Sequence, residues 1–434
     1  MFKTFKIHIE TKFPELSDKP FLLACSGGID SMVLADLFVK CGLNFAVAHC
    51  NFRLRGAASD ADAEFVSDMA NENGAKFYTT RFDTIGYVNK YKVSVQMAAR
   101  ELRYAWFTEI MQKNDIPYLV TAHHADDNLE TFLINLSRGT GIYGLTGIPE
   151  KTDSVARPLL AFSREQIEKY ARAEKIEWRE DSSNADTKYL RNTIRHKILP
   201  ELKGLNLNFL ENFQKTQRYL SQTAAIVANH LRELRTKIFI QERGITTISV
   251  STLSELRPLQ GYLYGLFGEY GFTEWNDVEN LLTATSGKEL RSGTHRLIKD
   301  RDVLLLSAIT SDKSLTYQIQ ENQAQIDYPL HIHITAEDIK ETGPHILYVA
   351  KNALKYPLTL RKWEKGDYFY PFGMKGTKKL SKFFKDEKMD IIAKENQWLL
   401  CSDGAIVWVV GKRADARFRV VEGTKNILKF ELKS

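Results

Sequence analysis

The chain of 434 residues is 43% hydrophobic and 26% charged, which is typical of a globular protein and excludes a disordered or fibrous one. At roughly 150 residues per domain, this length predicts about three domains. No apolar run approaches the roughly 18 residues of a membrane helix, and the first residues lack the pattern of a signal peptide. The four cysteines show no metal-binding spacing. We therefore expect reduced thiols, no zinc or iron–sulfur site, and a cytoplasmic protein without membrane association.

The positive charge is concentrated at the end of the chain. The net charge is +6, but the segment from Arg361 to Ser434 holds 17 Lys and Arg against 10 Asp and Glu, a net charge of +7. The other 360 residues together carry a net charge of −1. A basic domain on a near-neutral body indicates a polyanionic partner, although a solvated basic face would show the same pattern.

The first 200 residues alternate between strand and helix patterns. An amphipathic helix is predicted at the N-terminus, a long helix at 94–114 with Ser94 as its cap, and another helix with Ser59 as its cap. Strands are predicted at four places, 20–26, 44–50, 76–82 and 116–124. This alternation predicts an α/β fold with a doubly wound parallel sheet, in which ligands bind outside the carboxyl ends of the strands.

The pattern changes near Pro200. Hydrophobic residues recur at helical spacing over 206–240, and alternating segments near the end predict a small strand-rich domain. Between them lies a polar, weakly patterned stretch that we expect to be a connector with some strands. The predicted divisions are an α/β domain at 1–205, a mainly helical middle domain at 206–310, a connector at 311–345 and a basic domain at 346–434.

The strongest local signal is a glycine-containing turn between a buried strand and a helix. It consists of Ser26, Gly27, Gly28, Ile29, Asp30 and Ser31. Two glycines allow a tight turn whose N–H groups converge on an anion, and the helix start adds partial positive charge. The two serine hydroxyls can donate to phosphate oxygens, and Asp30 can hold Mg²⁺ or orient the loop. An ordinary glycine turn capped by Asp and Ser is the alternative.

A second polar run follows the fourth predicted strand. It reads His123-His124-Ala125-Asp126-Asp127-Asn128-Leu129-Glu130-Thr131, and Asp127 and Glu130 share one face of the helix that starts here. If the fourth strand neighbours the first, this run faces the glycine turn. One carboxylate could then hold Mg²⁺ and two could bind an ammonium group. Helix capping by the aspartates is the alternative, although capping requires neither His123 nor Glu130.

Several motifs together carry a resemblance to a known family. The run 26–31 matches the PP-loop of ATP pyrophosphatases, which cleave ATP between the α- and β-phosphates. With the other motifs, the chain closely resembles the tRNA(Ile)-lysidine synthetase family in its long form. These motifs are the run 123–131, Arg138-Gly139-Thr140-Gly141, Arg157-Pro158-Leu159, the EDSSN run at 180–184, Arg191-Asn192-x-Ile194-Arg195, and the C-terminal runs 361–367, 371–376 and 378–386. Residues 206–345 match only in general character.

The resemblance implies a carbon–nitrogen ligase that modifies an isoleucine tRNA with a CAU anticodon. ATP would adenylylate the C2 oxygen of the wobble cytidine and release pyrophosphate, and the ε-amine of L-lysine would then displace AMP. ATP and Mg²⁺ are therefore the expected substrate and cofactor. The oligomeric state stays open, with a homodimer as one alternative.

The resemblance also assigns roles to residues. Asp127 and Glu130 are the expected lysine-binding carboxylates, and Arg103 is the expected ATP-binding arginine beside the 26–31 loop. Asp30 and Asp126 are the candidate Mg²⁺ ligands, and His123 is either a proton acceptor or a supporting group. Together with Asp127 and Glu130, these three residues form the predicted catalytic set. The predicted tRNA-binding residues are Arg191, Arg195, Arg361, Lys375, Lys378, Lys379, Lys382 and Lys385.

Two other functions are compatible with parts of the sequence. An ATP pyrophosphatase that amidates a small molecule would use the same loop, but the basic last domain argues against it. A tRNA-binding module without catalysis would need neither the loop nor the carboxylates. In the basic tail, Phe383 and Phe384 are equally compatible with stacking on an exposed base and with the domain core.

Overall fold

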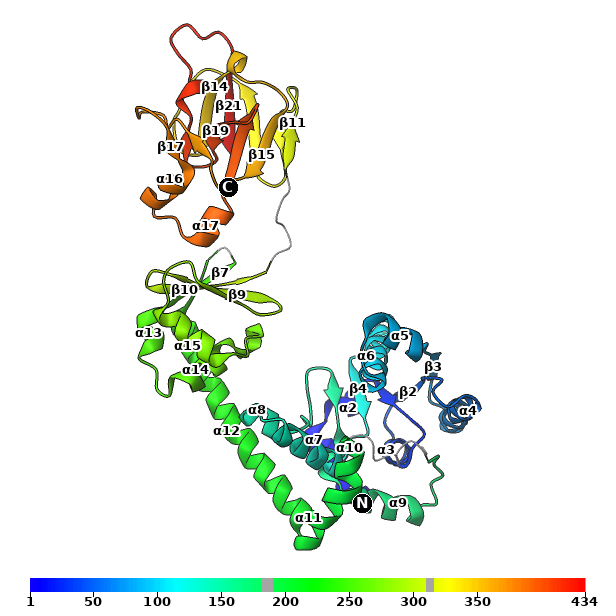
Figure 1. Cartoon of the computed structure of the whole chain (residues 1–434). Helices are drawn as coiled ribbons and strands as arrows, with labels where there is room; N and C mark the ends of the chain where they lie inside the picture. The colour runs from blue at the N-terminus through cyan, green and yellow to red at the C-terminus, as the bar shows by residue number, and fades with distance from the viewer. Residues whose placement is uncertain (181–189, 243, 310–315, 434) are drawn as a thin grey trace. The chain divides into compact units, whose positions relative to one another are not determined.

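The computed structural model describes the chain except for residues 181–189, 243, 310–315 and 434. It divides into two compact units, Met1–Ala228 and Asn229–Ser434 (Figure 1). Most of the EDSSN run, at 181–184, and the start of the predicted connector therefore lie outside the described residues. Across the described ranges, no helix is both long and apolar enough to span a bilayer.

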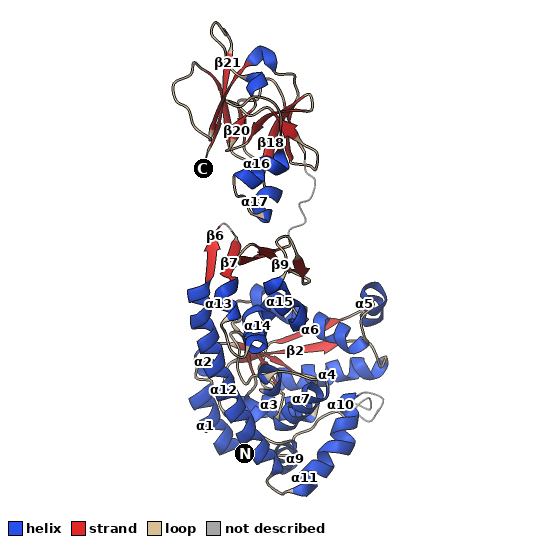
Figure 2. Ribbon diagram, turned by 60° about the vertical axis from the view of Figure 1, so that its left-hand side comes forward, coloured by secondary structure: helices blue, strands red, loops and turns tan. Residues whose placement is uncertain are grey.

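The first unit is built on a parallel sheet with the strand order β3-β2-β1-β4-β5. Its strands are β1 (Phe21–Ala24), β2 (Phe45–Asn51), β3 (Phe77–Arg81), β4 (Tyr118–Thr121) and β5 (Val155–Ala156). Phe21 and Leu23 pack into the core on one face, whereas Leu22 packs with Phe107 and Ile110 on the other. Helices therefore cover both faces (Figure 2), which confirms the predicted α/β class.

The helices of this unit follow the predicted amphipathic pattern with one correction. Ser94 caps α6 by accepting the N–H of Met97, as predicted. Ser59 does not cap its helix, because α4 already begins at Ala57 and the Ser59 hydroxyl accepts the N–H of Arg55. The helices before residue 180 are α1 (Phe2–Lys12), α2 (Glu15–Asp18), α3 (Ile29–Lys40), α4 (Ala57–Glu72), α5 (Thr84–Tyr91), α6 (Val95–Lys113), α7 (Ala125–Ser137), α8 (Ile142–Leu145), the 3₁₀ turn η1 (Pro158–Ala161) and α9 (Arg164–Ala173).

A second group of helices follows the undescribed segment. They are α10 (Leu190–Thr193), the π-helical turn η3 (Ile194–Ile198), α11 (Leu199–Leu205) and the long α12 (Phe209–Ile238). Helix α12 confirms the helix predicted at 206–240. Ile194 and Leu199 pack with Leu129 of α7, so this core places the polar side of η3 next to the start of α7.

The second unit begins with an antiparallel sheet in the order β6-β7-β10-β9-β8, packed with short helices. Leu263, Leu266 and Phe267 of α14 are buried against Leu297 and Leu304 of the sheet. Its elements are β6 (Phe239–Glu242), β7 (Ile245–Ser249), α13 (Val250–Ser254), α14 (Leu259–Phe267), η4 (Gly268–Tyr270), α15 (Trp275–Thr283), β8 (Glu289–Arg291), β9 (His295–Asp300) and β10 (Val303–Ala308).

The rest of the second unit is rich in strands, as predicted. Three sheets have the orders β11-β15-β18-β19-β20, β12-β13-β21-β14 and β16-β17. The elements are β11 (Tyr317–Ile319), β12 (Gln325–Ile326), β13 (Ile332–Ala336), β14 (Ile346–Ala350), η5 (Lys351–Ala353), β15 (Leu358–Lys362), β16 (Tyr368–Phe369), β17 (Lys378–Lys379), α16 (Leu380–Asp386), α17 (Ile391–Glu395), β18 (Trp398–Ser402), β19 (Ala405–Val409), β20 (Arg413–Ala414), η6 (Ala416–Phe418) and β21 (Ile427–Leu432).

The predicted connector contributes strands to these sheets. Strand β11 pairs with β15, and β13 pairs with β21 along five residues. Ile319 and Ile332 are buried in the same core as Trp408 and Phe430. Residues 317–336 are thus integrated with the C-terminal sheets, because their alternating apolar side chains fill that core.

Candidate functional site

The candidate site lies where strands β1 and β4 end. These strands are neighbours in the parallel sheet, with Ala24 paired to Thr121. The chain leaves β1 toward β2 on one side, whereas β4 leads to β5 on the other, so the strand order reverses here. Loops at such a switch point diverge and leave room for a ligand. Because His124 lies 3.7 Å from Asp30, the run 123–131 faces the loop 26–31, as expected.

The glycine turn has the geometry of an anion-binding loop. Gly27 has a φ of +84°, in the left-handed region that glycine adopts without strain. Gly28 is the N-cap of α3 and Ile29 is its first residue. The Ser31 hydroxyl donates to the Gly28 carbonyl at 2.9 Å and lies 3.3 Å from the Ser26 hydroxyl. Two hydroxyls and the first N–H groups of a helix therefore gather at the end of β1, where a phosphate would be stabilised.

Asp30 projects from the first turn of α3 into the site. Its Oδ2 accepts a charge-assisted hydrogen bond from Arg164 Nη1 at 2.6 Å, and its Oδ1 is buried without a hydrogen-bond partner. Burial raises the pKa of Asp30, although the neighbouring His124 and Arg164 oppose this shift. The unpartnered oxygen is the atom in this carboxylate that is available to a ligand.

The two histidines have different surroundings. His124 is the N-cap of α7, where its Nδ1 accepts the N–H of Asp127, and the Asp127 carboxylate accepts the N–H of His124 at 3.1 Å. Helix capping, which was the alternative explanation of the run 123–131, thus accounts for the roles of His124 and Asp127 at the start of α7. His123 Nδ1 lies 2.8 Å from the Thr121 hydroxyl. Burial lowers the pKa of His123 to about 4, so the ring is neutral near pH 7 and able to accept a proton.

Asp127 and Glu130 lie on one face of α7 and are both paired with arginines. Glu130 is fully buried and accepts from Arg191 Nε at 2.7 Å and from Arg195 Nε at 2.6 Å. Asp127 Oδ1 accepts from Arg195 Nη2 at 3.1 Å. Burial alone would raise the pKa of Asp127, but His124 and Arg191 outweigh it and the net pKa is lowered. The two arginines that the sequence assigned to tRNA therefore contact the predicted lysine-binding acids.

Asp126 is held by two basic residues that the sequence reading missed. Its Oδ2 accepts the backbone N–H of Arg164 at 2.8 Å, and its Oδ1 contacts the ammonium of Lys203. A capping box at Ser163 places Arg164 at the start of α9, and this S-x-x-Q pattern is readable in the sequence. No sequence motif marks Lys203, because it reaches Asp126 only through the position of α11 in the folded chain.

Arg103 lies one strand away from the loop. It is exposed on α6, and its guanidinium carbon lies 5.2 Å from the ring centroid of Phe52, which directly follows β2. Strand β2 neighbours β1, so Arg103 occupies the same edge of the sheet as the 26–31 loop. Its assignment to ATP stays a prediction.

The basic residues of the C-terminal domain fall into two groups. Arg361 forms a two-pronged ion pair with Asp367 at 2.8 Å, and Lys378 pairs with Asp386 at 2.7 Å. The others are exposed to solvent, namely Lys375, Lys379, Lys382 and Lys385. Phe383 and Phe384 are buried in a core with Leu399, which decides in favour of packing over base stacking.

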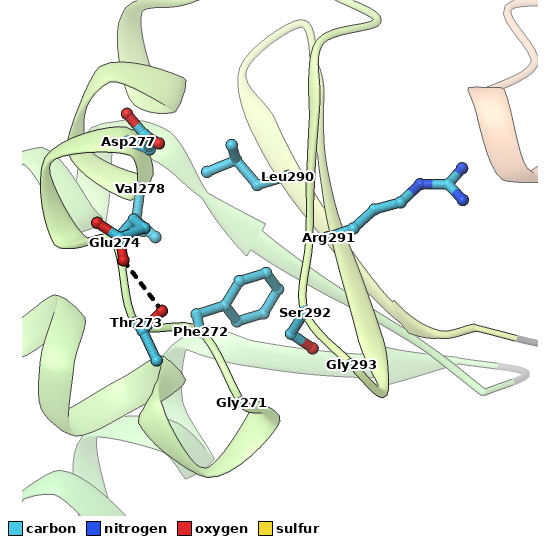
Figure 3. Close-up of a pocket in the computed structure, with 10 residues that line it drawn as sticks. All are labelled: Gly271, Phe272, Thr273, Glu274, Asp277, Val278, Leu290, Arg291, Ser292 and Gly293. Carbon is cyan, nitrogen blue, oxygen red and sulfur yellow. Dashed lines mark hydrogen bonds between the residues drawn. The ribbon is translucent and has the colours of Figure 1, made fainter. Parts of the chain in front are cut away.

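The second unit also contains a hollow of about 310 Å³ (Figure 3). None of the predicted site residues lines it, and the chemistry-bearing carboxylates lie in the first unit. Figure 3 shows Arg291 pointing away from the other side chains, while the Thr273 hydroxyl lies 3.3 Å from the Glu274 carboxylate. The lining residues are Gly271, Phe272, Thr273, Glu274, Asp277, Val278, Leu290, Arg291, Ser292 and Gly293.

Three family models match successive parts of the chain. A PP-loop domain matches residues 1–202, and a TilS substrate binding domain matches residues 241–309. A TilS substrate C-terminal domain matches residues 358–431. The first match contains both runs of the candidate site, and the third contains the basic residues from Arg361 onward.

Curated relatives match over nearly the whole length. The chain is 39% identical to the tRNA(Ile)-lysidine synthase of Parabacteroides distasonis, covering 99% of each chain. It is 35% identical to the tRNA(Ile)-lysidine synthase of Bacteroides thetaiotaomicron, covering 98% of each. Among solved structures, the U34-tRNA thiolase NcsA of Methanococcus maripaludis aligns with a TM-score of 0.43 and 16% identity, over 50% of this chain and 78% of that one. On the full-length sequence matches, the chain belongs to the tRNA(Ile)-lysidine synthase family.

Proposed function

We propose that this member of a family of carbon–nitrogen ligases joins L-lysine to C2 of the wobble cytidine in the CAU-anticodon isoleucine tRNA. ATP would first adenylylate the C2 oxygen and release pyrophosphate, after which the lysine ε-amine displaces AMP. The observation that carries the proposal is the meeting of an anion-binding loop and a group of carboxylates at one switch point. The first element suits a triphosphate, and the second suits an amine.

ATP is the substrate that the PP-loop family uses, and the loop geometry supports its binding here. We propose that the N–H groups at Gly27, Gly28 and Ile29 and the hydroxyls of Ser26 and Ser31 hold its phosphates. A positioned phosphate and a preorganised set of donors supply most of what adenylyl transfer requires, because the attacking oxygen and the leaving group must lie in line. Arg103 remains our candidate for a further ATP contact.

Asp30 fits a Mg²⁺ ion better than Asp126 does. Mg²⁺ prefers one or two carboxylates together with phosphate oxygens and water. Asp30 has a buried oxygen without a partner, whereas both oxygens of Asp126 already accept from Arg164 and Lys203. Within the described residues, no three His, Cys, Asp or Glu side chains form a ready metal-binding group. A bound Mg²⁺ would neutralise phosphate charge, and we propose Asp30 as its first protein ligand and Asp126 as the second.

The group of four charged residues on α7, α10 and η3 supports a site for a zwitterionic amino acid. Asp127 and Glu130 provide carboxylates for an ammonium group, and Arg191 and Arg195 provide guanidiniums for a carboxylate. We propose that L-lysine binds by exchanging partners with these ion pairs. His123, neutral near pH 7, is our candidate for accepting a proton from the attacking amine. The exposed lysines of the C-terminal domain would meet tRNA phosphates.

The test is incubation of the full-length protein with ATP, Mg²⁺, radiolabelled lysine and total bacterial tRNA, followed by nucleoside analysis. We expect one labelled cytidine derivative, with pyrophosphate and AMP released only when tRNA is present. Asp127→Ala should abolish labelling while retaining tRNA binding, and the exposed Asp153→Asn serves as its control. Full AMP release without tRNA would favour a small-molecule amidating enzyme, and full cellular function of Asp127→Ala would favour a non-catalytic binding module.

A further inference from the structure

The loop 138–148 directly follows α7 and begins with the Arg138-Gly139-Thr140-Gly141 motif. Across residues 131–149 the sequence contains four glycines and a single charged side chain, that of Arg138. A surface without acidic residues does not repel phosphates, and glycines allow a ligand to approach the backbone closely. The composition of this loop therefore suits contact with a nucleic acid.

Arg138 is available to a ligand. It is exposed, and within the described part of the chain its guanidinium has no ion-pair or hydrogen-bond partner. Arg191 and Arg195, by contrast, are held by the acids of α7. A guanidinium whose donors face water can bind a phosphate through two hydrogen bonds without first breaking an ion pair.

Side-chain amides hold the loop in a fixed position. Asn135 Nδ2 donates to the Gly144 carbonyl at 2.9 Å, and Asn128 Oδ1 accepts the N–H of Ile148 at 2.7 Å. Both asparagines belong to α7. Asn128 Nδ2 also donates to Gln217 Oε1 of α12 at 2.5 Å. The loop is therefore fixed to the helix that carries the lysine-binding acids at its other end.

Two apolar side chains are exposed beside Arg138. Leu136 is 54% exposed and Tyr143 is 41% exposed. They adjoin the two residues of the hydrogen bond between Asn135 and Gly144, so they lie near one another. An exposed aromatic ring close to a free guanidinium is a combination with which proteins hold unstacked bases and their phosphates.

We propose that Arg138 and Tyr143 bind the anticodon arm of the tRNA, with Arg138 at a phosphate and Tyr143 stacked on a base. Helix α7 has 13 residues and is about 20 Å long, at 1.5 Å per residue. A stacked strand advances about 3.4 Å per nucleotide, so the contact lies within about six nucleotides of the wobble cytidine. The inference rests on the proposed tRNA substrate and adds to it a contact in the first unit.

The first test measures equilibrium binding of the full-length protein to the CAU-anticodon isoleucine tRNA at several salt concentrations, without ATP or lysine. Arg138→Ala should weaken binding a fewfold and reduce the slope of log K against log salt by just under one. Tyr143→Ala should weaken binding by about 5- to 100-fold at an unchanged slope, whereas Tyr143→Phe should keep the parent affinity because it retains a ring. Arg172→Ala, which removes an exposed arginine of α9, is the control and should change neither quantity.

The second test locates the contact on the tRNA. A photoreactive benzoylphenylalanine in place of Tyr143 should crosslink to a nucleotide within about six positions of the wobble cytidine, as mapped by primer extension. Crosslinks confined to the acceptor stem or to a second copy of the protein, or unchanged binding in both alanine variants, would overturn the inference and leave the proposed function intact. Failure of the parent protein to bind this tRNA would overturn both.

Discussion

The switch-point site and the C-terminal basic surface use charge in opposite ways. At the switch point, Glu130 is completely buried and every predicted carboxylate lies against a cation. On the C-terminal domain, Lys379, Lys382 and Lys385 stand in solvent around a helix whose apolar side is buried. The acids of the first region are largely removed from water and their cations only partly so, whereas the lysines of the second region are exposed.

This difference in burial decides what each charge can do. Buried partners hold fixed positions, because leaving either one unpaired is costly. Exposed lysines are worth little to stability, but they can exchange counterions for a polyanion. The same residue types therefore point to positioned chemistry in one region and to electrostatic attraction in the other.

Glu130→Gln should have the largest effect. It leaves Arg191 and Arg195 facing an uncharged amide, and their partial exposure places the cost near the lower end of about 3–5 kcal/mol. Lysine incorporation should fall by roughly 100-fold or more, because the ammonium partner is lost. Glu109→Gln is the control, since Glu109 pairs with Lys113 at 2.6 Å on an exposed helix face and should cost less than about 1 kcal/mol. Equal thermal destabilisation of the two variants would contradict the contrast.

Gly27→Ala tests the backbone conformation and the close packing of the loop 26–31, and it changes no charge. A side chain at φ +84° costs about 1–2 kcal/mol, and its Cβ would press on Val66, so the loop must also shift. ATP binding should weaken at least about tenfold. Gly376→Ala in the basic domain has a similar φ of +86° with open space around it. Gly376→Ala should lower the free energy of unfolding only by the cost of the strained backbone, and it should leave ATP binding unchanged. If Gly376→Ala also lost ATP binding, the assignment of the loop 26–31 to ATP would be contradicted.

Removing exposed lysines should give a smaller, salt-dependent effect. Lys379→Ala and Lys382→Ala should each weaken tRNA binding a fewfold and reduce the slope of log K against log salt by just under one. Titrations at several salt concentrations measure both quantities. Lys425→Ala removes an equally exposed lysine outside the predicted set and should leave the slope unchanged. If all three variants behave alike, the basic surface has no defined tRNA contact.

The last prediction concerns the pH dependence of stability. The pKa of His123 is lowered to about 4, so between pH 6.5 and 4 the unfolded chain binds a proton that the folded chain does not. The free energy of unfolding is therefore highest, as far as His123 is concerned, above pH 6.5. It decreases as the pH falls below 6.5, by up to about 1.4 kcal/mol per pH unit. His123→Gln should flatten the decrease in unfolding temperature between pH 7 and pH 5. An unchanged pH profile would mean that His123 titrates normally.

Local sequence patterns were sufficient to predict much of the fold. The four main strands of the parallel sheet, the Ser94 cap and the long helix α12 follow from periodicity and capping chemistry, which act over a few residues. Ser59 shows the limit, because a suitable capping residue lay inside a helix that began two residues earlier. The strands within 317–336 were underestimated, since short strands gain stability from partners distant in sequence.

The sequence by itself determined the family, the fold class and the residue types at the site, because motifs and the alternation of strand and helix patterns depend on residues that are close together in the chain. Only the tertiary structure decided the partners. It placed Arg191 and Arg195 on the acids of α7, Lys203 on Asp126, and Phe383 and Phe384 in a core. The partners in these pairings lie from about fifteen to 77 residues apart in the sequence, and packing selects them through burial, which no local pattern encodes.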